Sequence, residues 1–164
     1  MENDYIAHID IKNILTSLTD VFMKTGIRSI KALLGIECKI HDIWEVRTKT
    51  VCCSNVVMTM GSSNDNYQTL LIIGIEQKSL CKLLGKEDVS PKFALDVLGE
   101  LGNTYCAILM DSKELTQYIG IVKQSIPMVY VNGQSYMPCI LGIEGKLYFG
   151  NDDFILMRYA IQKK

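Results

Sequence analysis

The chain has 164 residues, of which 48% are hydrophobic and 21% are charged. This length fits one compact domain, and the apolar content excludes intrinsic disorder, which requires few hydrophobic residues and a high net charge. The 17 basic and 18 acidic side chains leave a net charge of −1, so no broad electrostatic attraction to nucleic acid or to an anionic membrane is expected.

The apolar runs at residues 70–75 and 105–110 are far shorter than the roughly 20 residues that a membrane-spanning helix requires. The first residues, Met1-Glu2-Asn3-Asp4, show no basic segment before an apolar core, so no secretory signal is visible. We therefore expect a cytoplasmic protein without a membrane span.

Six cysteines are scattered along the chain, and none forms a Cys-x-x-Cys pair. The two histidines, His8 and His41, lie near neither each other nor a cysteine cluster. This pattern excludes the usual zinc spacings and favours reduced thiols that act as small hydrophobic side chains. Cys52 and Cys53 are expected to alternate within a strand and to point to opposite faces.

The N-terminal part predicts an amphipathic helix over residues 10–25, in which apolar side chains recur at helical spacing. Asp10 is the expected N-cap, and Gly26 is the expected stop signal. Residues 27–35 either extend this helix or form a turn, and the sequence does not decide between the two.

Strands are expected next, at residues 36–40, 43–46, 51–60 and 68–75. Between the last two lies the run Gly-Ser-Ser-Asn-Asp-Asn at residues 61–66, which is a strong turn signal. These two strands are therefore predicted to form a hairpin.

Two helices are expected in the middle of the chain. The first covers residues 76–84 and ends at Gly85. The second begins sharply, because Ser90 is a good N-cap and Pro91 suits the first helical position, and it runs to about Met110. Residues 112–124 are either further helix or an irregular connection.

The C-terminal third has the pattern of strands, with Asn132-Gly133 as a hairpin signal. The expected strands cover residues 126–131, 135–143, 146–149 and 154–161. No linker divides the chain, so residues 1–164 are expected to form a single domain. The element order predicts an α/β (α+β) fold with a mostly antiparallel sheet covered by helices.

The helix at residues 91–110 carries the strongest functional signal. At 100° per residue, polar side chains gather on the face opposite the apolar one; they are Lys92, Asp96, Glu100, Asn103 and Thr104. Glu100 and Asn103 are three apart and therefore neighbours. The small residues Gly99 and Ala107 are expected beside them on the exposed side, leaving both accessible to another molecule.

Alternatives remain for this helix. Glu and Asn three apart also occur on ordinary solvated surfaces, and Asp96 either contributes to docking or is simply solvated. Gly102 weakens the helix by roughly 1 kcal/mol relative to Ala. It falls on the buried side, where it permits a close approach of helix and sheet.

The run Gly99-Glu100-Leu101-Gly102-Asn103 resembles the signature helix of the CheC/CheX/FliY family of chemotaxis phosphatases, whose motif is Glu-x-x-Asn. The order of elements is similar over nearly the whole chain, including the β segment from Ile126-Pro127 to Gly133. CheC-like members carry two such sites, whereas residues 10–25 contain no Glu. One site resembles CheX most closely, and the lack of a FliN-like extension argues against FliY.

The resemblance implies two long helices against a sheet and dephosphorylation of the aspartyl phosphate of a CheY-type response regulator. It assigns the catalytic pair Glu100 and Asn103: Asn103 orients the attacking water, and Glu100 pairs with a lysine of the regulator. Mg²⁺ is expected in the regulator, so the chain needs no metal or cofactor of its own. A homodimer is possible, with β segments such as residues 154–161 joining sheet edges.

Two other interpretations stay open. The first is a non-catalytic adaptor of the same fold that binds a response regulator or a receptor-array component. The second is a structural dimer whose exposed helix binds no ligand.

Overall fold

The computed structural model describes residues 2–52, 54–131, 135–137 and 140–164. It begins with two consecutive helices, α1 (Glu2–Ser17) and α2 (Thr19–Leu34). The prediction of one helix over residues 10–25 is therefore wrong at both ends. Asp10 lies inside α1, and α2 continues to Leu34, where it is capped by Gly35 in the left-handed conformation with φ 69°.

Gly26 lies within α2 rather than ending it, because it faces the sheet. A Cβ atom at Gly26 would lie 2.7 Å from Leu147 Cδ1 and 3.1 Å from Met157 Sδ. The missing side chain lets the helix backbone approach the sheet closely, so the glycine serves packing rather than termination.

The larger sheet is antiparallel, with the strand order β1-β8-β9-β4-β3-β5, and β6 also pairs with β3. Its seven strands in the described part of the chain are β1 (Glu45–Arg47), β3 (Val56–Ser63), β4 (Tyr67–Ile75), β5 (Lys123–Gln124), β6 (Met128–Val131), β8 (Gly142–Tyr148) and β9 (Phe154–Lys163). A separate two-stranded sheet pairs β2 (Thr50–Cys52) with β7 (Ser135–Met137).

Three further helices complete the fold: α3 (Gln77–Leu84), α4 (Pro91–Met110) and α5 (Lys113–Ile119). The predictions for α3 and α4 are confirmed, including the cap at Gly85 and the start after Ser90. The undecided residues 112–124 contain α5 and then the short strand β5.

The predicted hairpin of β3 and β4 is confirmed, although Gly61–Ser63 belong to β3 and only residues 64–66 form its turn. Residues 36–40 form no regular strand; Lys39 makes an isolated bridge to Tyr148. The strand at residues 154–161 is wrongly expected at an edge, because β9 lies in the interior between β8 and β4. It therefore has no free backbone edge to offer a second copy.

The hairpin predicted at Asn132-Gly133 is not formed by the strands around it. β6 pairs with β3, and β7 pairs with β2; the turn itself lies outside the described residues, as does Cys53. The physical reason is competition for partners: Val129 and Val131 of β6 pack against the main core. The pairing of β6 with β3 brings them there.

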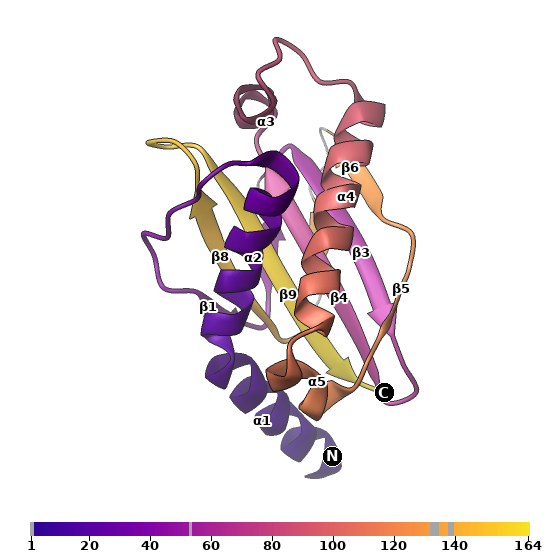
Figure 1. Ribbon diagram of the computed structural model, residues 1–164. Helices are drawn as coiled ribbons and strands as arrows, with labels where there is room; N and C mark the ends of the chain where they lie inside the picture. Colours follow the sequence, from indigo (N-terminus) through magenta and orange to yellow (C-terminus); the bar gives the residue numbers. More distant parts are fainter. Residues whose placement is uncertain (1, 53, 132–134, 138–139) are drawn as a thin grey trace.

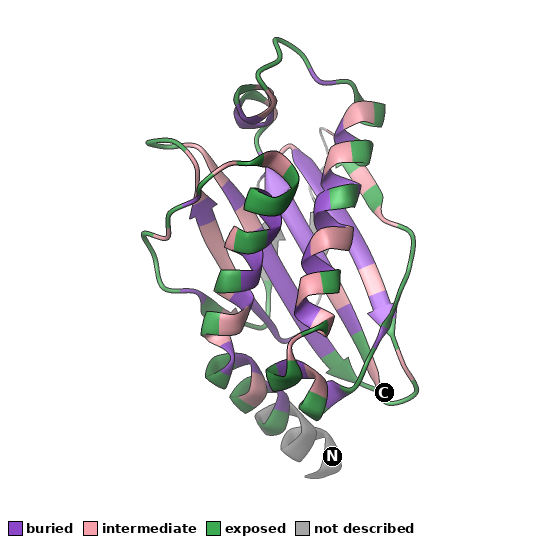
Figure 2. Ribbon diagram, in the orientation of Figure 1, coloured by how far each residue is buried: buried purple, intermediate pink, exposed green. Residues whose placement is uncertain are grey.

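Two long helices, α2 and α4, lie side by side across one face of the larger sheet (Figure 1). The residues facing the sheet are buried, and those facing away from it are exposed (Figure 2). The predicted fold class, a mostly antiparallel sheet covered by two long helices, is confirmed. The core holds Phe22 and Tyr159 with ring centroids 5.5 Å apart, together with Trp44, Met58 and Met60.

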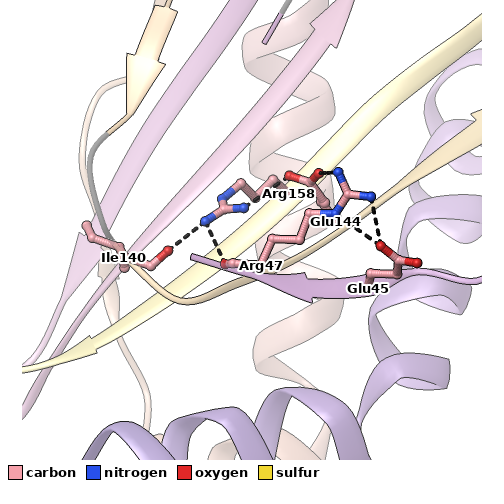
Figure 3. A network of polar contacts seen from close by, with 5 residues as sticks. All are labelled: Glu45, Arg47, Ile140, Glu144 and Arg158. Carbon is pink, nitrogen blue, oxygen red and sulfur yellow. Dashed lines mark hydrogen bonds and ion pairs between the residues drawn. The ribbon is translucent and has the colours of Figure 1, made fainter. Parts of the chain in front are cut away.

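On the opposite face, a polar network joins β1, β8 and β9 (Figure 3). Arg158 is only 3% exposed, and its Nη1 lies 3.0 Å from Glu144 Oε2. Its Nη2 donates to the carbonyl oxygens of Arg47 at 3.1 Å and Ile140 at 2.6 Å. A buried charge needs such partners, so the network fixes the edge strand β1 and the segment before β8.

In the described part of the chain, no helix combines the length and the apolar content needed to cross a bilayer.

Candidate functional site

Helix α4 is defined by strong local signals at its start. Ser90 accepts a hydrogen bond from the backbone N–H of Phe93 at 3.3 Å, and Pro91 occupies the first turn. The cap satisfies one of the N–H groups that the first turn leaves free. Twenty residues of regular helix follow, so the spacing of side chains along α4 obeys helical geometry.

The two faces of α4 are as the sequence predicts in outline. The buried residues of α4 are Ala94, Leu98, Gly99, Leu101, Gly102, Tyr105, Cys106 and Leu109. Asp96, Glu100 and Ala107 are exposed, whereas Asn103 and Thr104 are half-buried. Glu100 and Asn103, three apart on this helix, are neighbours, and Asp96 lies one turn before Glu100.

Two glycines of α4 make close approaches in different directions. A Cβ atom at Gly102 would lie 2.5 Å from Met58 Cε and 3.3 Å from Met60 Cε. Gly102 therefore faces the sheet, and the prediction that it permits a close approach is confirmed. Gly102 in α4 and Gly26 in α2 play the same part on opposite halves of the sheet.

The prediction that Gly99 lies on the open side of α4 is wrong. Gly99 is buried, and a Cβ atom there would lie 3.2 Å from Pro127 Cγ. The segment leading into β6 runs along this side of α4 because β6 pairs with β3. Asn103 follows Gly99 by one turn and lies on the same side of α4. This is the side along which the segment leading into β6 runs.

From the sequence, Pro127 is expected only within the β segment from Ile126-Pro127 to Gly133, and its contact with Gly99 is not predicted. A glycine in the middle of a well-capped helix was the available signal, since such a residue usually has a packing reason. The sequence did not identify Pro127 as the residue that packs against Gly99.

The side chains of Glu100 and Asn103 are free to bind another molecule. Among the described residues, neither makes a hydrogen bond or an ion pair, and the same holds for Asp96. An exposed carboxylate beside a half-buried amide can accept and donate hydrogen bonds to a partner at no cost to internal contacts. The arrangement therefore fits recognition of another molecule.

The titratable groups beneath the site are poor nucleophiles. Burial raises the pKa of the Cys106 thiol to about 12, and burial also raises the pKa of Tyr105 well above its usual range. Both side chains therefore stay protonated at neutral pH. Cys106 offers no thiolate, which is the reactive form of cysteine.

The polar surface of α4 lies on the outside of the helix layer (Figure 2). Two depressions in the described part of the chain have volumes of about 570 Å³ and about 610 Å³. Residues of α4 line neither of them.

Helix α2 occupies the corresponding place on the other half of the sheet but lacks the same residues. If Gly26 is matched to Gly102, the positions of Glu100 and Asn103 are taken by Lys24 and Ile27. In the described structure, α4 alone of these two helices carries Glu-x-x-Asn.

No group of three or more histidine, cysteine, aspartate or glutamate side chains suited to a metal ion occurs among the described residues. This leaves the polar surface of α4 as the strongest candidate site.

No protein-family model matches this chain, and no curated protein sequence matches it. Solved structures do match. The chemotaxis protein CheX from Desulfovibrio desulfuricans is 12% identical with a TM-score of 0.70, covering 89% of this chain and 99% of that one. CheX from Borrelia burgdorferi, solved in a CheX-CheY-BeF3-Mg²⁺ complex, is 13% identical with a TM-score of 0.62, covering 86% and 95%.

The FliM middle domain from Helicobacter pylori is also similar, with 13% identity, a TM-score of 0.58 and 91% of each chain covered. The chain therefore has the fold of CheX- and CheC-like chemotaxis proteins. The same fold includes a FliM domain, so the architecture does not by itself define a catalytic activity.

Proposed function

We propose that this chain is a CheX-like phosphatase, a single domain over residues 1–164, which hydrolyses the aspartyl phosphate of a CheY-type response regulator in the cytoplasm. The observation that carries the proposal is the pair Glu100 and Asn103, unpartnered on the outer surface of a helix in a CheX-like fold. The Borrelia CheX complex supports a CheY-type partner. The exposed helix face suits a substrate that is itself a protein.

In the proposed reaction, a water oxygen forms a bond to phosphorus while the bond from phosphorus to the aspartyl oxygen breaks. The products are inorganic phosphate and a free carboxylate. Catalysis of such a step rests mainly on positioning and charge stabilisation. The Asn103 amide donates and accepts hydrogen bonds without carrying charge, so it can orient the water beside an anionic group without repelling that group.

Glu100 has a different part in the proposal. Its carboxylate is exposed and lies beside Asn103, where it is placed to pair with a lysine of the regulator. Such a pair fixes the register of docking more than it adds affinity. The divalent metal belongs to the regulator, and the chain supplies no metal or cofactor.

The strongest alternative is a non-catalytic adaptor that binds the regulator through the same surface. The similarity to a FliM middle domain favours keeping this alternative. A homodimer is also proposed. Because β9 is interior, strand pairing between copies would use β1 on one side of the larger sheet or β5 and β6 on the other.

A phosphate-decay experiment under multiple-turnover conditions separates enzyme from adaptor. The regulator is labelled on its aspartate by a small phosphodonor, and its loss of phosphate is followed with and without a substoichiometric amount of this chain. A phosphatase accelerates the loss over many turnovers. Binding of the regulator without faster loss of phosphate would favour the adaptor and overturn the enzyme.

A further inference from the structure

The exposed face of α2 has the opposite charge from that of α4. Three basic residues and one acidic residue lie in α2, namely Lys24, Arg28, Lys31 and Asp20. Helix α4 holds one basic residue, Lys92, and two acidic ones, Asp96 and Glu100. All seven side chains are exposed, so this difference is presented to any partner that docks here.

The three basic side chains of α2 point away from the sheet. Gly26 faces the sheet, and at 100° per residue Lys24, Arg28 and Lys31 all lie within about 40° of the opposite direction. By the same arithmetic, Glu100 lies about 20° from the direction opposite Gly102. Because α2 and α4 are neighbours over one face of the sheet (Figure 2), these side chains share one outer surface.

The basic residues also stand at the height of the site along the helices. Tyr105 Oη donates a hydrogen bond to the carbonyl oxygen of Phe22 at 3.5 Å, which joins the two helices at one level. The helices run in opposite directions (Figure 1). Arg28 is six residues after Phe22 and Glu100 is five before Tyr105, so they lie about 9 Å and about 7.5 Å further in the same direction.

Arg28 therefore lies about level with Glu100 on the adjacent helix. Neighbouring helix axes are typically about 8–10 Å apart. The lysines on either side of Arg28 form ion pairs with acidic side chains of the same chain: Lys24 lies 3.6 Å from Asp20, and Lys31 pairs with Glu37. These pairs are exposed and therefore weak and exchangeable. Arg28 makes no ion pair or hydrogen bond among the described residues.

The proposed substrate creates a need for such a surface. A phosphoryl group carries between one and two negative charges at neutral pH, yet the helix that must approach it presents Asp96 and Glu100. Nearby positive charge offsets this repulsion and speeds the encounter of the two proteins. A row of cations on the neighbouring helix, level with the site, meets this requirement.

We propose that Lys24, Arg28 and Lys31, the α2 basic row, form a second part of the docking surface, which attracts the negatively charged phosphoryl group of the regulator toward Glu100 and Asn103. This inference rests on the proposed function. Its occupant is the same partner that docks on α4, and its effect is on encounter rather than on the hydrolytic step.

The test compares Arg28→Glu with the wild-type chain in the decay of phosphorylated regulator. At about 0.02 M salt we expect KM to rise about 5-fold or more while kcat stays within about 2-fold, and at about 0.5 M salt the difference in KM should fall below about 2-fold. Arg28→Lys should retain the wild-type KM. Lys78→Glu, the matched reversal of an exposed cation on α3, should change KM by less than about 2-fold.

An unchanged KM for Arg28→Glu at low salt would overturn the inference and leave the proposed function intact. So would a change in KM that is equal at both salt concentrations, or a change in oligomeric state in sedimentation, which would assign the row to a second copy. If the wild-type chain does not accelerate decay, the phosphatase function fails. The row is then judged by binding to regulator treated with beryllofluoride and Mg²⁺, which Arg28→Glu must weaken at low salt.

Discussion

Pro127 packs against Gly99, with its Cγ only 3.2 Å from the place where a Cβ atom of residue 99 would lie. This contact ties the segment before β6 to the helix that carries Glu100 and Asn103. It means that the candidate site is built from two parts of the chain, although its polar groups come from one helix. The geometry of the site therefore depends on the packing of the sheet edge as well as on α4.

Enlarging Gly99 is expected to disturb this contact. Gly99→Leu forces Pro127 away from α4, and overpacking of this kind costs about 1–3 kcal/mol of the free energy of unfolding. The regulator decay rate should fall as well, since Asn103 lies one turn further on the same side. Urea unfolding and the decay assay measure the two effects. Lys92→Leu, at an exposed position of the same helix, is the control; equal behaviour of the two variants would contradict the account.

Removing the charge of Glu100 is expected to weaken docking. Glu100→Gln keeps the size of the side chain and removes its attraction to a lysine of the regulator, so KM should rise about 10-fold at low salt with a smaller change in kcat. Asp96→Asn tests whether the carboxylate one turn earlier also takes part in docking. A fall in kcat with no change in KM for Glu100→Gln would contradict a docking role.

The network around Arg158 is expected to act on stability rather than on the site. Arg158→Ala leaves Glu144, whose side chain is 10% exposed, without its buried cation, and such a loss costs about 3–5 kcal/mol. Arg47→Ala removes an exposed arginine from the same carboxylate, 3.3 Å away, and should cost about 1 kcal/mol or less. Equal losses of unfolding free energy for Arg158→Ala and Arg47→Ala in urea would contradict the expectation that the buried arginine contributes more than the exposed one.

Several elements could be predicted from the sequence because local signals define them. Ser90-Pro91 and the following apolar spacing fix α4, Gly85 ends α3, and a polar turn joins β3 to β4. That Glu100 and Asn103 are neighbours on the surface of α4 follows from helical spacing alone. These are features in which residues close in sequence determine the geometry.

The remaining errors come from contacts between distant residues. Gly26 is read as a stop signal but is required by Leu147 and Met157 of the sheet. The Asn132-Gly133 signal is overridden because β6 and β7 find other partners. Likewise, nothing local shows that residues 154–161 lie inside the sheet, or that Pro127 meets Gly99.

Alkaline pH is expected to destabilise the fold through Cys106. Burial raises the pKa of this thiol from its usual 9.0 to about 12, so the unfolded chain releases the proton first. The protonated Cys106 thiol therefore contributes to the free energy of unfolding fully below pH 9. This contribution is lost as the pH rises toward 12, at about 1.4 kcal/mol per pH unit. Urea unfolding between pH 8 and 11 should show a shallower decline for Cys106→Ala, and parallel declines would contradict this expectation.

If Asn103 orients the water that attacks the phosphorylated regulator, its removal must abolish most of the acceleration. The most direct measurement is the rate of phosphate loss from the regulator with wild-type chain, with Asn103→Ala, and with Thr104→Ala as the adjacent half-buried control. We expect Asn103→Ala to lose the acceleration by about 100-fold or more at unchanged stability, while Thr104→Ala stays close to wild type. Acceleration by Asn103→Ala equal to that of the wild-type chain would contradict the account.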